Sequence, residues 1–142
     1  MGKSTSFDNS LLLLIFNGNN IANLADNAAS PITSLFLSLH TADPSSGNQN
    51  TSEIVYTSYN RVAVSRNSAG WTVTGANAVN ANNIAFPQCT GGNNTAAFFA
   101  IGKNNTGTAG QLYYVGALNS NLIVTNGITP TFAPGTAIVS EA

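Results

Sequence analysis

The 142-residue sequence predicts a mainly β protein: an antiparallel β-sandwich, jelly-roll-like, with a short N-terminal α-helix. The sequence holds about eight short candidate strands, several of which alternate apolar with polar side chains, and signals for turns recur every eight to twelve residues. Only the segment 1–27 shows helical spacing, and we expect it to form an N-terminal helical segment. Because no linker divides the chain, we expect residues 1–142 to form a single domain.

The predicted helix carries an apolar stripe. Phe7, Leu11 and Ile15 recur at intervals of four residues, so that one face of the helix can lie on a core. The run Leu11–Phe16 is too short for a membrane span, which needs about twenty residues, and we read it as part of a buried helix. Candidate caps are Ser4, Ser6 or Asp8 at the start and Gly18 after the end.

The first half of the chain holds four candidate strands. In residues 35–40 the leucines alternate with Phe36, Ser38 and His40, which is the period of a strand. Residues 59–66 and 71–74 also alternate, and the glycine between them makes the pair resemble a hairpin. A short run at 84–86 ends at a proline.

The second half predicts further strands at 96–102, 112–118 and 136–140. Between them, residues 122–125 and 128–132 flank Asn126-Gly127. This dipeptide is preferred in two-residue type I′ turns because both central residues need a positive φ. We therefore predict a β-hairpin at this position.

Charge is scarce throughout. Charged residues make up 6% of the chain, where an ordinary domain has about 25%. From Asn67 to Ser140 the only charged side chain is Lys103, so predicted strand edges lack the lysines that usually prevent pairing with other chains. Such a surface suits a protein covered by copies of itself or by a larger assembly. Four basic residues without a cluster argue against nucleic acid as a partner, and we expect no membrane partner.

Residues for catalysis are few. His40 is the only histidine and Cys89 the only cysteine, so a Ser-His-Asp triad or a zinc site has few candidates. Asp43 and Glu53 bracket a polar loop and could approach each other as paired carboxylates, but a solvated loop is the simpler interpretation. We predict no enzyme activity, no catalytic residue, no cofactor and no metal.

A carbohydrate-binding module is the alternative. Jelly rolls often bind glycans, and such a site needs an exposed aromatic ring beside an acidic or amide side chain. Tyr56 and Tyr59, near Glu53, form the candidate cluster. This site would contact glycans on a host surface.

The order of segments resembles a family of small tailed-bacteriophage virion proteins, labelled tail-fibre-like or minor structural proteins. The resemblance covers about Phe7 to Glu141 and implies a β-sandwich, a place in the virion and symmetric oligomers. It supplies no catalytic residues. The most specific segments are Ser38-Leu39-His40-Thr41-Ala42-Asp43-Pro44, the pair Tyr59 and Arg61, and the segment from Ile84 to Phe86 and Pro87.

We therefore expect a non-enzymatic structural protein of a phage virion. It would associate with itself, as a homotrimer, because closed symmetry hides strand edges. It would dock on the major capsid protein or on head–tail connector proteins, as capsid decoration (cement) or as a short fibre or spike of the tail or collar. Candidate interface residues are Phe7, Leu11, Leu14, Ile15, Tyr56, Tyr59 and Arg61.

Overall fold

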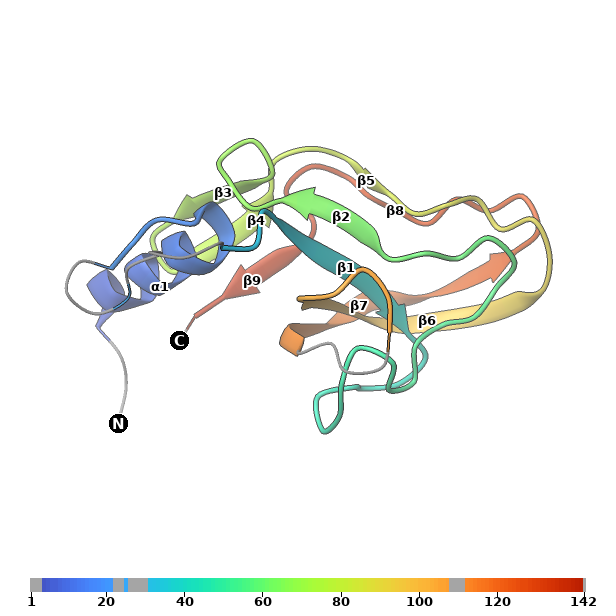
Figure 1. Cartoon of the computed structure of the whole chain (residues 1–142). Coiled ribbons are helices and arrows are strands. Elements are labelled where there is room, and N and C mark those ends of the chain that lie inside the picture. The colour runs from blue at the N-terminus through green and yellow to red at the C-terminus, as the bar shows by residue number, and fades with distance from the viewer. Residues whose placement is uncertain (1–3, 22–24, 26–30, 108–111, 142) are drawn as a thin grey trace. The chain divides into compact units, whose positions relative to one another are not determined.

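The computed structural model describes residues 4–21, 25, 31–107 and 112–141. It confirms a mainly β chain with antiparallel pairing and one short N-terminal helix (Figure 1). The face-to-face packing of a sandwich stays a prediction. The elements are α1 (Thr5–Asn17), β1 (Ser34–His40), β2 (Val62–Ser65), β3 (Trp71–Thr74), β4 (Asn77–Asn80), β5 (Ile84–Ala85), β6 (Asn93–Gly102), β7 (Leu112–Thr125), β8 (Thr131–Phe132) and β9 (Ile138–Ser140).

The chain forms two compact units, and neither is a continuous stretch of sequence. Unit 1 comprises Met1–Ser34, Ser65–Ile84 and Phe132–Ala142. Unit 2 comprises Leu35–Val64 and Ala85–Thr131.

Unit 1 consists of α1 and a three-stranded sheet in the order β3-β4-β9. The pairs are antiparallel, with Trp71 opposite Asn80 and Ala78 opposite Val139. α1 packs against β3 and β4, and the fully buried ring of Phe16 meets Trp71 edge to face, with centroids 4.6 Å apart. This aromatic pair is the centre of the unit 1 core.

The ends of α1 are well capped. The Ser4 hydroxyl accepts a hydrogen bond from Phe7 N at 3.3 Å, and Gly18 closes the helix with φ +72°. The Arg66 guanidinium donates to the carbonyls of Ile15 (Nε, 2.7 Å), Leu14 and Ile32 (Nη1, 3.2 Å). A cation at this end also opposes the negative pole of the helix dipole. Of the predicted caps, Ser4 and Gly18 are confirmed.

The predicted core stripe of α1 was wrong by one position. The buried side chains are Asp8, Leu12 and Phe16, and the predicted Phe7 is 37% exposed. Both stripes have the same spacing, and Leu11–Phe16 is apolar on every side of the helix. Spacing alone therefore left the choice open, and the large Phe16 ring settles it by packing on Trp71.

Unit 2 is built on a four-stranded sheet in the order β2-β1-β6-β7. β1 pairs antiparallel with β6, with Leu37 opposite Ile101. The alternation predicted for this first strand is confirmed by three fully or almost fully buried leucines. Ser38 and His40, on the other face of β1, are buried as well, so this strand is covered on both faces.

Two predicted hairpins were wrong. The strand at 62–65 lies beside β1, whereas β3 pairs with β4, a strand that the sequence did not reveal. At Asn126-Gly127 a turn is present, since Ile128 N donates to Thr125 O at 3.0 Å. Gly127 has φ +90° but Asn126 is not in the positive-φ region, so the turn is not type I′. The chain beyond it bonds to residues 86–89, and β8 pairs with β5.

β7 is an edge strand of its sheet, and a bulge divides it. Its register against β6 moves from Ala96↔Leu122 to Phe98↔Ala117, so two steps along β6 match five along β7. The intervening segment 118–121 exposes three polar side chains. Bulges at an edge strand hinder pairing with strands of other chains. The bulge therefore protects this edge in the way that charged side chains usually do. The polar residues are Asn119, Ser120 and Asn121.

Candidate functional site

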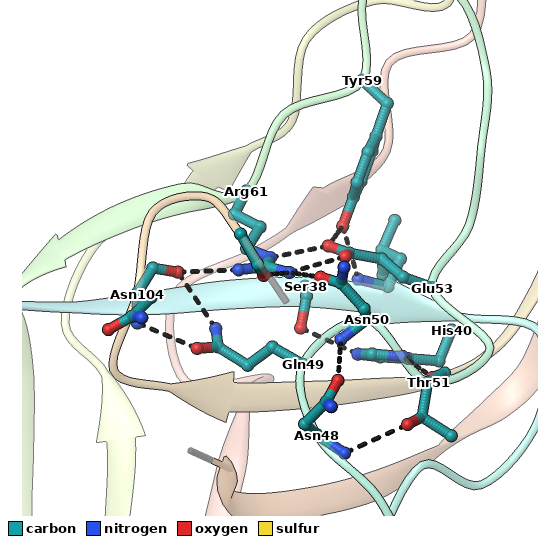
Figure 2. Close-up of polar contacts among 12 residues, drawn as sticks. Ser38, His40, Asn48, Gln49, Asn50, Thr51, Glu53, Tyr59, Arg61 and Asn104 are labelled. Atoms are coloured by element: carbon teal, nitrogen blue, oxygen red, sulfur yellow. Dashed lines mark hydrogen bonds and ion pairs between the residues drawn. The ribbon is translucent and has the colours of Figure 1, made fainter. Parts of the chain in front are cut away.

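A buried polar network in unit 2 holds much of the chain's ionisable chemistry (Figure 2). Its residues come from β1, from the loop that follows it, from Arg61 just before β2 and from the loop after β6. The members are Ser38, His40, Gln49, Asn50, Thr51, Glu53, Tyr59, Arg61, Asn104 and Gly107.

Arg61 is the centre of the network. Its Nε donates to Glu53 Oε1 at 2.8 Å and its Nη2 to Glu53 Oε2 at 2.7 Å, which is a two-pronged ion pair. The same guanidinium donates to the carbonyls of Asn104 (3.0 Å) and Gly107 (3.3 Å) and to the Asn50 amide oxygen. The side chains of Arg61 and Glu53 are 4% and 14% exposed. The carboxylate of Glu53 raises the pKa of Arg61, so the guanidinium stays charged.

Gln49 joins the two loops a second time. Its Nε2 donates to Asn104 O at 3.1 Å, and Asn104 N donates to its Oε1 at 2.8 Å. The side chain is fully buried over Gly102, where an added Cβ would lie 2.3 Å from Gln49 Cδ. Any larger residue at this position of β6 would push Gln49 out of these hydrogen bonds. Both the amide nitrogen and the amide oxygen of Gln49 are hydrogen-bonded, so this buried side chain ties the two loops together without an unsatisfied polar atom.

Tyr59 supports the acidic side of the network. Its hydroxyl donates to Glu53 Oε1 at 2.8 Å and accepts from Leu39 N at 3.2 Å. Its ring contacts the ring of Tyr56 edge to face, with centroids 5.3 Å apart, and the ring of Phe86, 6.2 Å away and nearly parallel. Burial, with the nearby Glu53 charge, raises the pKa of Tyr59. The tyrosine therefore stays neutral and serves as a hydrogen-bond donor.

The tyrosine pair does not form an exposed platform for a sugar. Tyr56 is 6% exposed, and its hydroxyl donates to Pro87 O at 2.8 Å. Burial raises the pKa of Tyr56 to about 12. Tyr59 is only half-buried, but aromatic neighbours contact its ring. The carbohydrate hypothesis required exposed rings at these two positions, and the structure places Tyr56 in the interior.

His40 is fully buried and uses both ring nitrogens. Nδ1 lies 2.9 Å from Thr51 O, and Nε2 lies 2.8 Å from Ser38 Oγ. A carbonyl only accepts, so Nδ1 carries the proton and Nε2 accepts from the serine hydroxyl. Ser52, next to Thr51, has φ +53°, a costly conformation that this fixed loop maintains. His40 thus anchors the loop in its neutral form.

Stability should fall in mild acid because of His40. Burial lowers the pKa of His40 below its usual 6.5 in the folded chain. Just below pH 6.5 the histidine is therefore protonated in the unfolded chain and still neutral in the folded chain. Above pH 6.5 the free energy of unfolding should not depend on His40 protonation. Below pH 6.5 it should decrease by at most about 1.4 kcal/mol per pH unit.

Urea unfolding at pH 7.5, 6.5 and 5.5 checks this expectation. His40→Gln should remove the slope in this range even if it lowers stability at every pH. Asp43→Asn is the control, since this exposed carboxylate lies outside the network and has its pKa lowered by the Ser45 hydrogen bond. An unchanged slope in His40→Gln would refute the assignment.

The other candidate groups for catalysis are not brought together. Asp43 Oδ1 accepts from Ser45 N at 2.9 Å, whereas Glu53 binds Arg61. Cys89 is fully buried, with Sγ 3.3 Å from Gly91 O, so it is not paired with His40. Among the residues that the structure describes, no three His, Cys, Asp or Glu side chains cluster as metal ligands would. In the same part of the chain, no helix has the length and hydrophobicity to cross a membrane.

The predicted interface residues fall into two groups. Phe7, Leu11, Leu14 and Ile15 lie on the partly exposed side of α1. Tyr59 and Arg61 belong to the buried polar network, and Tyr56 packs against the ring of Tyr59. Tyr56 and Arg61 are 6% and 7% exposed. The second group therefore shapes the loops and offers little surface of its own.

Sequence reasoning missed most of the network. An ion pair between Glu53 and Arg61 could have been predicted from the small number of charged residues. A chain with four basic and five acidic residues offers few partners of opposite charge for a buried side chain. Gln49, Asn50 and Asn104 gave no such signal, since amides are common in this sequence and only the fold separates buried from exposed ones. Arg66 was likewise missed, although it is the cation that caps α1.

Comparison with known proteins identifies the family. The profile of the family described as podophage GP4 fiber I protein gp80 matches residues 2–140. No curated protein matches the sequence. The mainly β fold and the inward use of charge agree with a structural protein. The chain therefore belongs to the podophage GP4 fiber I protein gp80 family and is a structural fibre protein of a tailed-phage virion.

Proposed function

We propose that the protein is a non-enzymatic subunit that associates with itself as a homotrimer. It docks on the major capsid protein or on head–tail connector proteins, as a decoration (cement) protein or as a short fibre or spike near the collar. The main support is the uncharged surface of its outer elements. Neither α1 nor β7 exposes a charged side chain, because the one Asp, Glu, Lys or Arg in either element, Asp8, is buried.

The inward use of charge supports a structural role over a catalytic one. Arg61 and Glu53 bind each other, His40 has no free ring nitrogen, and the Cys89 thiol is buried. These groups are the ones that acid, base or nucleophilic chemistry would need at an accessible site. In this arrangement Arg61, Glu53 and His40 hold the loops 41–61 and 103–107 of unit 2 through hydrogen bonds.

Measuring the mass of the purified protein tests the self-association. We expect light scattering to give three times the 14.6 kDa of one chain. Because the candidate contacts are apolar, this mass should persist at 0.5 M salt, where charge contacts are screened. A mass equal to one chain across micromolar concentrations would contradict the proposal.

Docking is tested separately with phage heads. The protein should cosediment with heads that lack it, and gold-labelled protein should mark a fixed position on the particle by electron microscopy. Heads that still carry the protein are the control, because their sites are filled. Failure to cosediment with the depleted heads would contradict the docking proposal while leaving the self-association intact.

A further inference from the structure

Two asparagines of the chain precede a glycine, at Asn17-Gly18 and at Asn126-Gly127. In such a pair the backbone nitrogen of the glycine can attack the Cγ atom of the asparagine, because glycine has no Cβ to hinder the approach. The N–Cγ bond forms, the Cγ–Nδ2 bond breaks, and the side-chain amide leaves as ammonia with the proton of the backbone N–H. Water then opens the succinimide ring to aspartate or isoaspartate. The reaction needs no other reagent, so the structure around each pair sets its rate in the folded protein.

Asn126-Gly127 lies in an exposed turn of unit 2 that is bonded to residues 88 and 89. Gly127 N, the nitrogen that would attack, donates to Cys89 O at 2.8 Å, and Cys89 N donates to Ile128 O at 2.8 Å. Gln88 Nε2 donates to Gly127 O at 2.9 Å. We call these three hydrogen bonds the clamp. The Asn126 side chain is exposed and has no hydrogen-bond partner among the described residues, so only the clamp restrains the reacting atoms.

The clamp is a local structure that opens at low cost. The turn residues 125–129 and Gln88 are all exposed. Opening the clamp therefore breaks three hydrogen bonds but uncovers little apolar surface. Such local openings have free energies far below that of global unfolding. Each opening releases Gly127 N beside the Asn126 amide, so the rate of deamidation is the intrinsic rate multiplied by the fraction of time that the clamp is open.

Asn17-Gly18 has the same chemistry but lies in a more stable structure. Asn17 is the last residue of α1, and Gly18 N donates to Leu13 O in the cap of the helix. With its amide oriented so that both of its atoms are satisfied, Asn17 Nδ2 donates to Trp71 O at 3.2 Å. Freeing the attacking nitrogen would unwind the helix end next to Phe16, which is fully buried. This opening costs much more apolar burial than opening the clamp.

We propose that Asn126 is a site of spontaneous deamidation in the folded protein and that the clamp sets its rate. Asn17 stays intact for as long as unit 1 is folded. The product places a negative charge in the stretch from Asn67 to Ser140, where Lys103 is the only charged side chain. Where the product is isoaspartate, the backbone of the turn also gains a methylene group. The chemistry is independent of the proposed self-association.

Mapping the modified residue after incubation gives the first test. Trypsin places Asn17 and Asn126 in different peptides, 4–61 and 104–142. Folded protein and protein in urea are incubated in mildly alkaline buffer, and fragmentation mass spectrometry locates the deamidation. In urea the two asparagines should react at similar rates, because each precedes a glycine. In the folded protein Asn126 should react faster than Asn17 by about tenfold or more. Equal rates in the folded protein, or no reaction at Asn126, would overturn the proposal.

Loosening the clamp gives the second test. Gln88→Ala removes the side-chain hydrogen bond to Gly127 O and should speed the deamidation of Asn126 about three- to tenfold, the factor that one hydrogen bond contributes. Asn82→Ala is the matched control, because this exposed amide donates to a backbone carbonyl of unit 1, Ala69 O, at 2.8 Å and should leave the rate unchanged. Circular dichroism shows whether each variant is folded. If folded Gln88→Ala reacts no faster than the unchanged protein, the clamp does not control the reaction and the proposal is wrong.

Discussion

Replacing Arg61 by methionine should lower the free energy of unfolding by about 3–5 kcal/mol, the usual cost of removing one partner from a buried ion pair. Methionine fills similar space but donates no hydrogen bond. Glu53 would keep a largely buried carboxylate without its cation, and the carbonyls of Asn104 and Gly107 would lose a donor. Urea unfolding monitored by tyrosine fluorescence measures the loss.

Two further variants show where this loss arises. Lys103→Met removes an exposed cation and should change stability by less than about 0.5 kcal/mol. Adding Glu53→Gln to Arg61→Met should recover part of the loss, because the uncompensated charge disappears. If Arg61→Met cost under about 1 kcal/mol, the network would not hold the loops as described.

Replacing Trp71 by alanine should cost about 3–5 kcal/mol, the range for truncating a large buried aromatic residue. Trp71 is fully buried, and its ring is the surface on which Phe16 packs. Its removal would leave a cavity under α1 and weaken the hold on the helix. Guanidinium unfolding measures the total loss, and hydrogen exchange should show faster opening of the α1 amides than of the β6 amides.

Trp71→Phe is the control for this change. It keeps an aromatic contact with Phe16 and should cost much less than the alanine variant. An equal rate increase in α1 and β6 upon Trp71→Ala would mean that the helix does not depend on this ring in particular.

The strands were largely predictable because their signal is local. Alternating side chains located β1 and β3, because successive residues of a strand point to opposite faces of the sheet. A short apolar run located β6. Pairing was not predictable to the same degree. Because the two runs are adjacent in sequence, they suggested a hairpin between β2 and β3. In the structure β3 pairs instead with the next segment, 77–80, whose alternation is weak.

The site was harder to predict than the fold because its signals are not local. Tyr59 was predicted to make contacts with a partner because it lies near a polar loop, and Arg61 was named with it as a candidate interface residue. Instead Arg61 is buried and Tyr59 half-buried, because Glu53 binds both of them and a carbonyl of a loop some forty residues away accepts from Arg61. Such mutual satisfaction depends on chain folding that no short pattern encodes.

The bulge in β7 has a consequence for assembly size. Sheets that present long, straight, uncharged borders can add strands from chain after chain and grow into insoluble fibrils. In β7 the segment with Asn119, Ser120 and Asn121 interrupts the regular edge. A strand from another chain could therefore pair with only two short stretches of β7. Assembly by strand addition therefore stops here, and a chain almost without electrostatic protection can still form particles of finite size.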